Sequence, residues 1–308
     1  MLEAMRGCRN GRAVMAVAFL VALLAACRLW SWRSSHALTV SSVPGRMSDQ
    51  TLDYFLRKAL IEDRDAAAIL WSHAANSRAT ITEALKSPAH MIEADVLFRG
   101  HEPVEPIMAH PPDTDSDITL QDWLKEVVTS DKGIKLDFKR LPVVEPSMKV
   151  LQSMQGRIRA PVWINADVLP GPNGTDSQPV DPHTFLDVVS PGFPGAVLSL
   201  GWTTGWSAHV DDQGYSWEMV REMEGMCRGL QQPVTFPVRA ALLRNSFPQL
   251  KWLLQQAERY SLTVWTGKND VYAVEDLILY RQAFNKSRIY YDIPEPQNTL
   301  FKNSPGYF

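Results

Sequence analysis

The sequence predicts an α/β fold, a single (β/α)₈ barrel of the TIM type behind an N-terminal hydrophobic leader. Two observations lead to this prediction. Short β-branched and apolar runs alternate with longer segments of helical period, which is the pattern of repeated βα units. The chain has 308 residues, and the roughly 265 that follow the leader suit one large barrel better than two domains.

Eight strand-like runs can be counted in this region. They are Ala68–His73, Met91–Leu97, Ile134–Phe138, Val162–Asn165, Ala196–Leu200, Val234–Val238, Leu262–Thr266 and Ile289–Asp292. A further run, Pro106–His110, is expected to extend the mouth of the barrel. Thr80–Glu83 and Thr119–Asp122 have the sequence of capping boxes at helix starts, and the Pro- and Gly-rich residues 170–174 and 190–195 predict loops.

The first 45 residues differ from the rest, so we expect a leader over 1–45 and the barrel over 46–308. Arg6, Arg9 and Arg12 precede the apolar run Ala13–Cys27. A run of this length falls short of the about 20 residues of a membrane span, and its positive flank is typical of a signal peptide or short signal anchor. The expected location is the secretory pathway, secreted or membrane-anchored. A leader without a targeting function would leave the barrel in the cytoplasm.

Composition narrows the possible partners. With 45% apolar residues and ten Trp the chain can bury a large core, and its net charge of -3 offers no basic surplus for nucleic acid. Only Cys227 lies in the barrel region, so no disulfide within it is possible. Asn173 and Asn285 begin glycosylation acceptor sequences, and Asn173 is expected to carry a glycan if the chain is secreted.

Several strands carry charged residues on one face only. The two-residue period of a strand aligns Lys135, Asp137 and Lys139 on one side, and Glu93 with Asp95 on another strand. Helices cover the outside of a parallel barrel, so these faces must point inward, toward the open C-terminal mouth where barrel active sites lie.

Three carboxylates, those of Glu93, Asp95 and Asp137, would repel one another at one mouth unless a cation lay between them. Their hard oxygen donors suit Mg²⁺ or Ca²⁺. His73 and His110 end runs at the same mouth, and beside a carboxylate cluster a catalytic role is favoured over a structural one.

Longer motifs carry a resemblance to known families. The chain resembles the phospholipase C-like phosphodiesterase superfamily, which includes glycerophosphodiester phosphodiesterases and sphingomyelinase D toxins. The motifs that carry this resemblance are Trp71–Asn76, Glu93–Asp95, His110, Lys135–Lys139 and Val264–Thr266. The chain resembles the menorin family of animal proteins more closely, at Ile107–Pro112, Gly133–Lys139, Trp163–Asp167 and Gly201–Trp206. This likeness covers nearly everything from about Leu52 to Phe301, as in a short, single-domain member.

The superfamily resemblance implies a role for each matching residue. Glu93, Asp95 and Asp137 match metal ligands, while His73 and His110 match an acid–base pair. Two further residues match the superfamily pattern, Lys139 beside the phosphate and Trp265 on the seventh strand. The candidates for lining the substrate site are Asn76, Lys135, Asn165, Asp167, Trp202, Trp206 and Arg239. For Asn165, Asp167, Trp202, Trp206 and Arg239, packing or a supporting role is an equal alternative.

The chain also departs from the glycerophosphodiesterase pattern. Those enzymes have His-Arg-Gly where this chain has His73-Ala74-Ala75, which puts glycerol-type substrates in doubt. The spacing of His73 to Asn76 and an Asp at 137 are more similar to sphingomyelinase D. That arrangement favours attack by a hydroxyl within the substrate and a cyclic phosphate product.

Two functions follow as hypotheses. The first is a metal-dependent phosphodiesterase or phospholipase D-like enzyme acting on a small-molecule or lipid phosphodiester, such as a lysolipid. The second is a non-catalytic extracellular binding or adhesion module of the menorin type, with extracellular protein partners and a part in shaping neurons. The presence of both histidines and all three acids favours the enzyme, because a scaffold does not need them.

Overall fold

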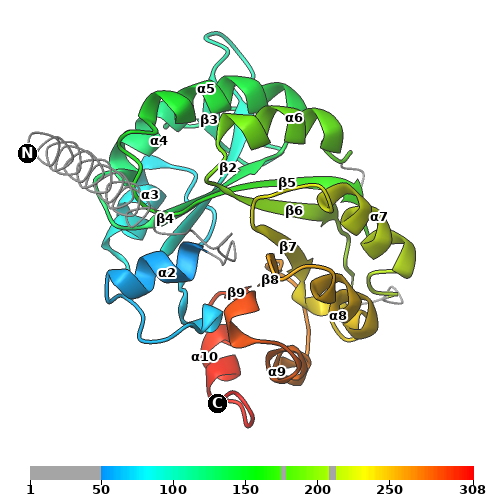
Figure 1. Cartoon of the computed structure of the whole chain (residues 1–308). Helices are drawn as coiled ribbons and strands as arrows, with labels where there is room; N and C mark the ends of the chain where they lie inside the picture. The colour runs from blue at the N-terminus through cyan, green and yellow to red at the C-terminus, as the bar shows by residue number, and fades with distance from the viewer. Residues whose placement is uncertain (1–49, 175–177, 208–212) are drawn as a thin grey trace, which may run out of the picture. The chain divides into compact units, whose positions relative to one another are not determined.

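The predicted barrel is confirmed. A computed structural model of the chain describes residues 50–174, 178–207 and 213–308. Eight parallel strands follow one another in the order β1-β2-β4-β5-β6-β7-β8-β9, and they curve into a nearly closed barrel (Figure 1). The short β3 pairs antiparallel with β2, in the connection between the strand and the helix of the second βα unit.

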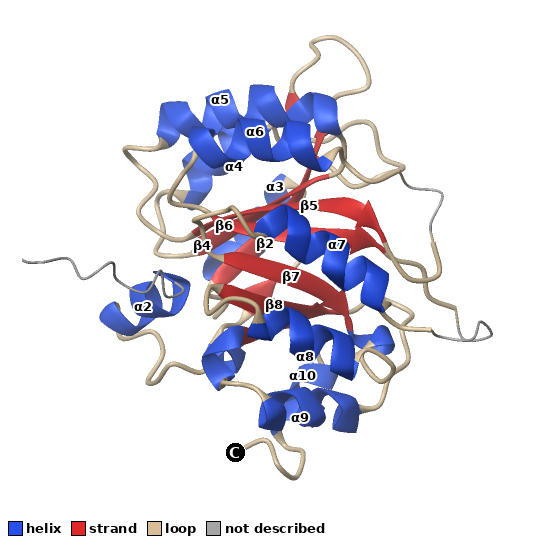
Figure 2. Cartoon of the chain, turned by 45° about the vertical axis from the view of Figure 1, so that its right-hand side comes forward, coloured by secondary structure: helices blue, strands red, loops and turns tan. Residues whose placement is uncertain are grey.

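The strands are β1 (Trp71–Ser72), β2 (Met91–Phe98), β3 (Pro106–Met108), β4 (Gly133–Phe138), β5 (Val162–Pro170), β6 (Val197–Thr203), β7 (Val234–Arg239), β8 (Tyr260–Trp265) and β9 (Ile289–Asp292). The helices are α2 (Gln50–Arg57), α3 (Arg78–Lys86), α4 (Leu120–Val127), α5 (Val144–Met154), α6 (Pro182–Gly192), α7 (Trp217–Cys227), α8 (Phe247–Gln255), α9 (Val274–Ala283) and α10 (Gln297–Lys302). Figure 2 shows the helices packed around the outside of the sheet.

Each strand has an apolar outer face and a more polar inner one. On β2, Ile92, Ala94 and Val96 are fully buried in the main core between sheet and helices. Glu93 and Asp95 alternate with them and therefore point into the barrel. The helix layer thus leaves the inward-facing charges access to solvent only along the barrel axis.

Helix α2 closes the end of the barrel where the strands begin. Its Leu52 and Phe55 are fully buried in a second core with Trp163 and Tyr290. The indole N–H of Trp163 donates to the hydroxyl of Thr51 over 2.9 Å. Among the described residues, this second core fills the inside of the barrel at that end, so the inward-facing charges are reached from the opposite end, which we call the mouth.

The predicted first strand is largely wrong. The run Ala68–His73 contains only the two-residue β1, and its beginning belongs to the 3₁₀ turn η1 (Ala66–Ala68). Asp65 starts that turn by accepting a hydrogen bond from the Ala67 N–H over 3.0 Å. The capped 3₁₀ turn thus includes Ala68, which the apolar pattern assigns to the strand.

Two helix boundaries also differ from the sequence pattern. The capping box of α3 lies at Ser77 and Thr80, three residues before the predicted one, because the Ser77 hydroxyl accepts from the Thr80 N–H and Thr80 returns the bond. Helix α6 continues to Gly192, through part of the predicted loop at 190–195. Pro191 is tolerated there because only the last turn of the helix loses a hydrogen bond. The predicted cap of α4 at Thr119 is confirmed.

The leader Ala13–Cys27 lies outside the described residues. Within the described part of the chain, no helix is long and apolar enough to cross a membrane.

Candidate functional site

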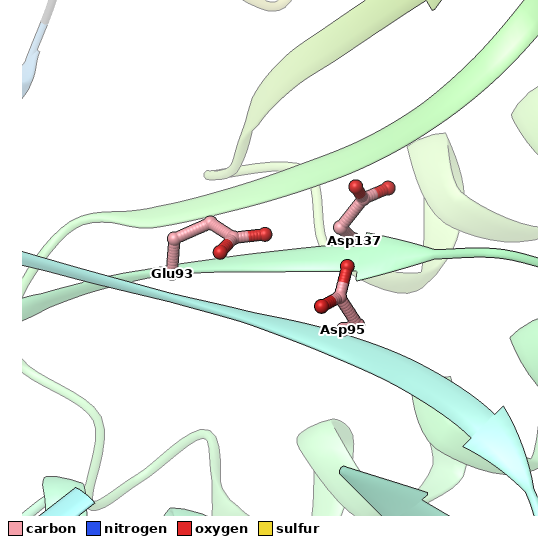
Figure 3. Close-up of side chains that lie close together, drawn as sticks. All are labelled: Glu93, Asp95 and Asp137. Atoms are coloured by element: carbon pink, nitrogen blue, oxygen red, sulfur yellow. The ribbon is translucent and has the colours of Figure 1, made fainter. Parts of the chain in front are cut away.

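The three predicted metal ligands lie together at the mouth. Asp95 on β2 is in register with Asp137 on β4, and Glu93 lies two residues before Asp95 on the same inward face. One oxygen atom from each carboxylate lies within 4.8 Å of the others (Figure 3). The sequence-based placement of this cluster is therefore matched by the structure.

Hydrogen bonds from neighbouring segments hold the two aspartates in place. The Asn76 side chain donates to Asp95 Oδ2 over 2.7 Å and accepts from the Asp95 N–H over 2.8 Å. Asn165 donates to Asp137 Oδ1 over 2.7 Å, and its own carbonyl accepts from the Ser199 hydroxyl over 2.5 Å. Two of the predicted lining residues, Asn76 and Asn165, thus hold the carboxylates by hydrogen bonds, as residues around the ligands of metal sites do.

Glu93 is held by the loop after β1. The Ala74 N–H donates to Glu93 Oε2 over 2.8 Å, and Ala74 takes a left-handed backbone conformation with φ of 55° to do so. A non-glycine residue rarely adopts this conformation, so the surrounding structure must enforce it. The turn that follows His73 is therefore built around the carboxylate.

Lys139 lies directly between the two aspartates. Its Nζ is 2.6 Å from Asp137 Oδ2 and 2.9 Å from Asp95 Oδ1. Burial opposes the charge of Lys139, but Asp137 and Asp95 outweigh it and hold the pKa of the amine well above its ordinary value. Burial likewise works to raise the pKa of Asp137, yet Lys139 and Lys135 keep it below the ordinary value.

The inside of the mouth carries more negative than positive groups. The carboxylates are Glu93, Asp95, Asp137, Asp167 and Asp292, whereas the lysines are Lys135 and Lys139. Burial, together with repulsion from neighbouring carboxylates, raises the pKa of Glu93 and of Asp167 to about 7 each. An excess of buried carboxylate oxygen with partly neutralised acids is the donor set that a divalent cation such as Mg²⁺ or Ca²⁺ fits.

His73 is joined to the last strand of the barrel. Its Nδ1 lies 2.9 Å from Asp292 Oδ2 and 3.5 Å from Glu93 Oε2. Asp292 ends β9 and is buried, whereas the His73 side chain is half exposed. The aspartate can therefore fix the ring while Nε2 stays available to a ligand. Asp292 was not among the predicted site residues. Its one sequence signal was an acid at the C-terminal end of an expected strand.

The acids around His73 make its contribution to stability depend on pH. Glu93 and Asp292 raise the pKa of His73 from 6.5 to about 10, against the opposing effect of burial. Because the folded-state pKa is raised, protonated His73 stabilises the fold below about pH 6.5, and this contribution is lost as the pH rises toward 10. In metal-free protein we expect the melting temperature of the wild type to fall more over this range than that of His73→Asn. Parallel pH profiles for the two proteins would contradict the assignment.

His110 follows β3 and is exposed at the mouth. Its Nδ1 lies 2.6 Å from the Pro111 carbonyl oxygen. It lines a cleft of about 320 Å³ together with Asn76, the hydrogen-bond partner of Asp95. The second predicted acid–base residue is thus linked to the carboxylate cluster through Asn76, which lines the cleft and bonds to Asp95.

Asp167 lies beside the cluster on β5. Its partner position on β6 is Gly201, where an added Cβ would come within 2.4 Å of Asp167 Oδ1. Glycine at 201 is therefore what makes room for this carboxylate. Asp167 interacts electrostatically with Asp137 and Lys139, which places it at the edge of the cluster.

Arg239 and Trp265 form a second wall of the mouth, at the ends of β7 and β8. Arg239 donates to both carboxylate oxygens of Asp270, over 2.7 and 2.6 Å, and to the Thr204 carbonyl over 3.1 Å. Its guanidinium group lies 5.2 Å from the centre of the Trp265 ring. Arg239, at the end of β7, thus links the loops that contain Thr204 and Asp270 beside the Trp265 ring. This is a supporting role, and it uses most of the hydrogen-bond donors of Arg239.

Of the two tryptophans predicted to line the site, Trp202 faces away from the inside of the barrel. Trp206 is partly buried against the main core. Trp202 is only 1% exposed and packs on Tyr215 and Phe236, on the outer, helix-covered side of the sheet. The structure therefore supports the alternative considered for Trp202, which is packing. Its place on β6 explains this, because the inward positions are Ser199, Gly201 and Thr203.

Trp202→Ala separates packing from ligand binding. Removing a fully buried aromatic side chain should lower the free energy of unfolding by about 3–5 kcal/mol. Chemical denaturation of the wild type and the variant measures this difference. A loss below about 1 kcal/mol would show that the ring is not part of the core.

Comparison with known proteins agrees with the motifs. A model of the menorin N-terminal domain matches residues 65–298. Human "Protein FAM151B" is 58% identical over 265 residues, covering 85% of this chain and 96% of that protein. A crystal structure of a glycerophosphoryl diester phosphodiesterase from Parabacteroides distasonis overlays with a TM-score of 0.45 at 13% identity, covering 79% of this chain and 87% of that one. The matched domain spans most of the barrel, and the chain therefore belongs to the menorin family.

Proposed function

We propose that the barrel mouth binds one divalent cation, Mg²⁺ or Ca²⁺, and cleaves a phosphodiester there. The observation that carries the proposal is the convergence of Glu93, Asp95 and Asp137 within 4.8 Å, inside a mouth where acids outnumber lysines. His73 lies 3.5 Å from Glu93, and His110 follows Ala109, whose N–H donates to the Asp95 carbonyl over 3.0 Å. Family membership is compatible with the proposal but does not name a substrate.

The residues at the mouth have different roles in such a reaction. When bound, the cation supplies positive charge that polarises a phosphoryl oxygen. Lys139, already beside the acids, can turn toward the substrate and stabilise negative charge that develops on the phosphoryl group. His73, held at Nδ1 by Asp292, and His110, across the cleft, are the groups that move protons to and from the reacting oxygens.

The class of substrate follows from the motifs around His73. The spacing of His73 to Asn76, and the absence of the glycerophosphodiesterase His-Arg-Gly, favour attack by a hydroxyl of the substrate itself. We therefore expect a phosphodiester with a free hydroxyl beside the phosphate, such as a lysolipid, and a cyclic phosphate product. Such a reaction breaks one P–O bond and forms another, while a proton passes from the attacking hydroxyl to the leaving oxygen.

Phosphorus NMR of lipid and small-molecule phosphodiesters incubated with the full chain tests the proposal. With millimolar Mg²⁺ or Ca²⁺ we expect a cyclic phosphate signal that EDTA removes. His73→Asn, which keeps the three carboxylates, serves as the matched control and should be inactive. Turnover that is unaffected by EDTA or by the His73 change would rule out this mouth as the site.

A specific observation favours a second function, that of a binding module. Lys139 pairs with Asp95 and Asp137, so two of the three acids are satisfied without a cation. A barrel of this kind could present a rigid surface to extracellular protein partners without chemistry. Calorimetry distinguishes the two functions. A module of this kind would show no heat of binding with either cation, whereas the enzyme would bind one per chain.

For the cellular location we propose the secretory route, which rests on the apolar leader. Asn173 is exposed, in a left-handed turn with φ of 59°, so its side-chain amide can be reached by a glycosyltransferase. Expression in animal cells should therefore give a product whose mass falls on endoglycosidase treatment, and Asn173→Gln should remove that change. A cytosolic product without a glycan would contradict the location and leave the chemistry of the mouth untouched.

A further inference from the structure

The face of the barrel opposite the mouth carries a concentration of positive charge. Five loops lead into β5–β9 at this end, and Glu258 is their one acidic residue. They carry six basic residues: Arg157, Arg159, Arg228, Arg259, Lys286 and Arg288. Four of these are exposed and two, Arg259 and Arg288, are half-buried. We call these six residues the basic face.

This concentration stands in a chain whose net charge is -3 overall. The loops on both sides of β3, at the mouth end, show the opposite balance. There Arg99 is accompanied by five acids: Glu102, Glu105, Asp113, Asp115 and Asp117. The loops around β3 and the five loops of the basic face therefore carry opposite signs, and the basic face attracts anions.

The basic face is hollowed at its larger cluster of arginines. A cavity of about 770 Å³ is lined by Arg228, Arg259 and Arg288, together with Arg64. Arg228 pairs with the carboxylate of Glu224 over 2.6 Å. The other two donate to main-chain carbonyl groups, and the buried Nε of Arg259 has no hydrogen-bond partner.

A second hollow lies at the remaining arginines. Arg157 and Arg159, both exposed, line a space of about 520 Å³ at the start of β5, together with Asp131, whose carboxylate pairs with Lys58 over 2.8 Å. Strand β6 lies between β5 and β7 in the sheet, so the two hollows are about 10 Å or more apart at the usual strand spacing. A small anion can occupy one of them, whereas a chain of regularly spaced anionic groups can occupy both.

We propose that the basic face binds a linear sulfated polysaccharide. The planar guanidinium fork matches sulfate oxygens in pairs, and arginine predominates in this cluster. Membrane-surface helices and loops also need exposed Trp, Phe or Leu to enter the lipid. Among the described residues, none of the exposed large apolar side chains lies in the five loops, so a soluble polyanion fits this face better than a bilayer. The inference goes beyond the proposed function and uses no residue of the mouth.

Variants for the test are chosen so that the fold is not disturbed. Arg259 and Arg288 also satisfy carbonyl groups at the ends of α7 and α8, so they are left intact. The double variant Arg157→Gln/Arg159→Gln removes two exposed charges from the basic face. Arg244→Gln, in the exposed loop after β7 at the mouth end, is the matched control for loss of a charge elsewhere.

Fluorescence anisotropy with a labelled heparin oligosaccharide measures the affinity of the full chain. The protein is produced in bacteria, because Asn285, which lines the same cavity as Arg228, begins a glycosylation acceptor sequence. We expect the double variant to raise Kd roughly tenfold and to reduce the salt dependence by about two ions, while Arg244→Gln changes Kd by less than about twofold. Three results would each overturn the proposal: no binding at physiological salt, an equal effect of Arg244→Gln, or equal binding to phosphatidylserine vesicles that the double variant also abolishes.

Discussion

Replacing His73 with asparagine is expected to slow phosphodiester cleavage by about 10²–10⁴-fold, the usual contribution of a positioned acid–base group. Asparagine keeps a hydrogen-bonding group beside Asp292 and leaves Glu93, Asp95 and Asp137 unchanged. Cation binding should therefore persist, and the loss should appear in kcat rather than in KM. Steady-state kinetics on the substrate found by phosphorus NMR measures this directly.

Asp292→Asn tests how His73 is held. Asp292 touches His73 over 2.9 Å and has no place in the carboxylate cluster, so it acts as a positioning residue. We expect a smaller loss of kcat than for His73→Asn, together with a shifted pH profile, because the imidazole loses the acid that favours its charged form. An unchanged pH profile, or a loss of cation binding, would show that Asp292 has a different role.

Asp137→Asn is expected to remove most of the thermal stabilisation that a divalent cation gives. A cation present at 100 times its Kd adds about 2.7 kcal/mol to the free energy of unfolding. In a domain of this size that is roughly 5–10 °C in melting temperature. Asparagine keeps the shape of Asp137 and its bond to Asn165, but it lacks the charge that attracts the cation.

Asp167→Asn is the matched control for this measurement. It makes the same chemical change one strand away, on a carboxylate that lies beside the cluster and outside it. The control should keep most of the stabilisation by Mg²⁺ or Ca²⁺. If the wild type shows no shift with either cation at millimolar concentration, Lys139 satisfies the acids and the cluster is structural.

The sequence predicts the barrel well because helix and strand periods alternate over the whole domain. Seven of the eight expected strands are found near their predicted positions, since buried β-branched runs have few other places to go, and the first is shortened to the two residues of β1. The inward direction of Glu93, Asp95 and Asp137 follows from the same reasoning. A parallel strand covered by helices has one polar face, and that face points into the barrel.

What the sequence does not show depends on contacts between distant segments. Asp292 meets His73 only because the barrel brings β9 beside β1, 219 residues away along the chain. Trp202 follows a glycine and lies in a motif of the family, yet the strand period turns it outward into the core. The position of Lys139 between two acids also depends on the register of β2 against β4, which no local pattern specifies.

Soaking crystals of the protein with Mn²⁺, an oxygen-binding cation with anomalous scattering, tests the central claim most directly. We expect one anomalous peak between the carboxylates of Glu93, Asp95 and Asp137, and no such peak in crystals of Asp137→Asn. A map without a peak at this place, with Lys139 still paired to Asp95 and Asp137, would contradict it.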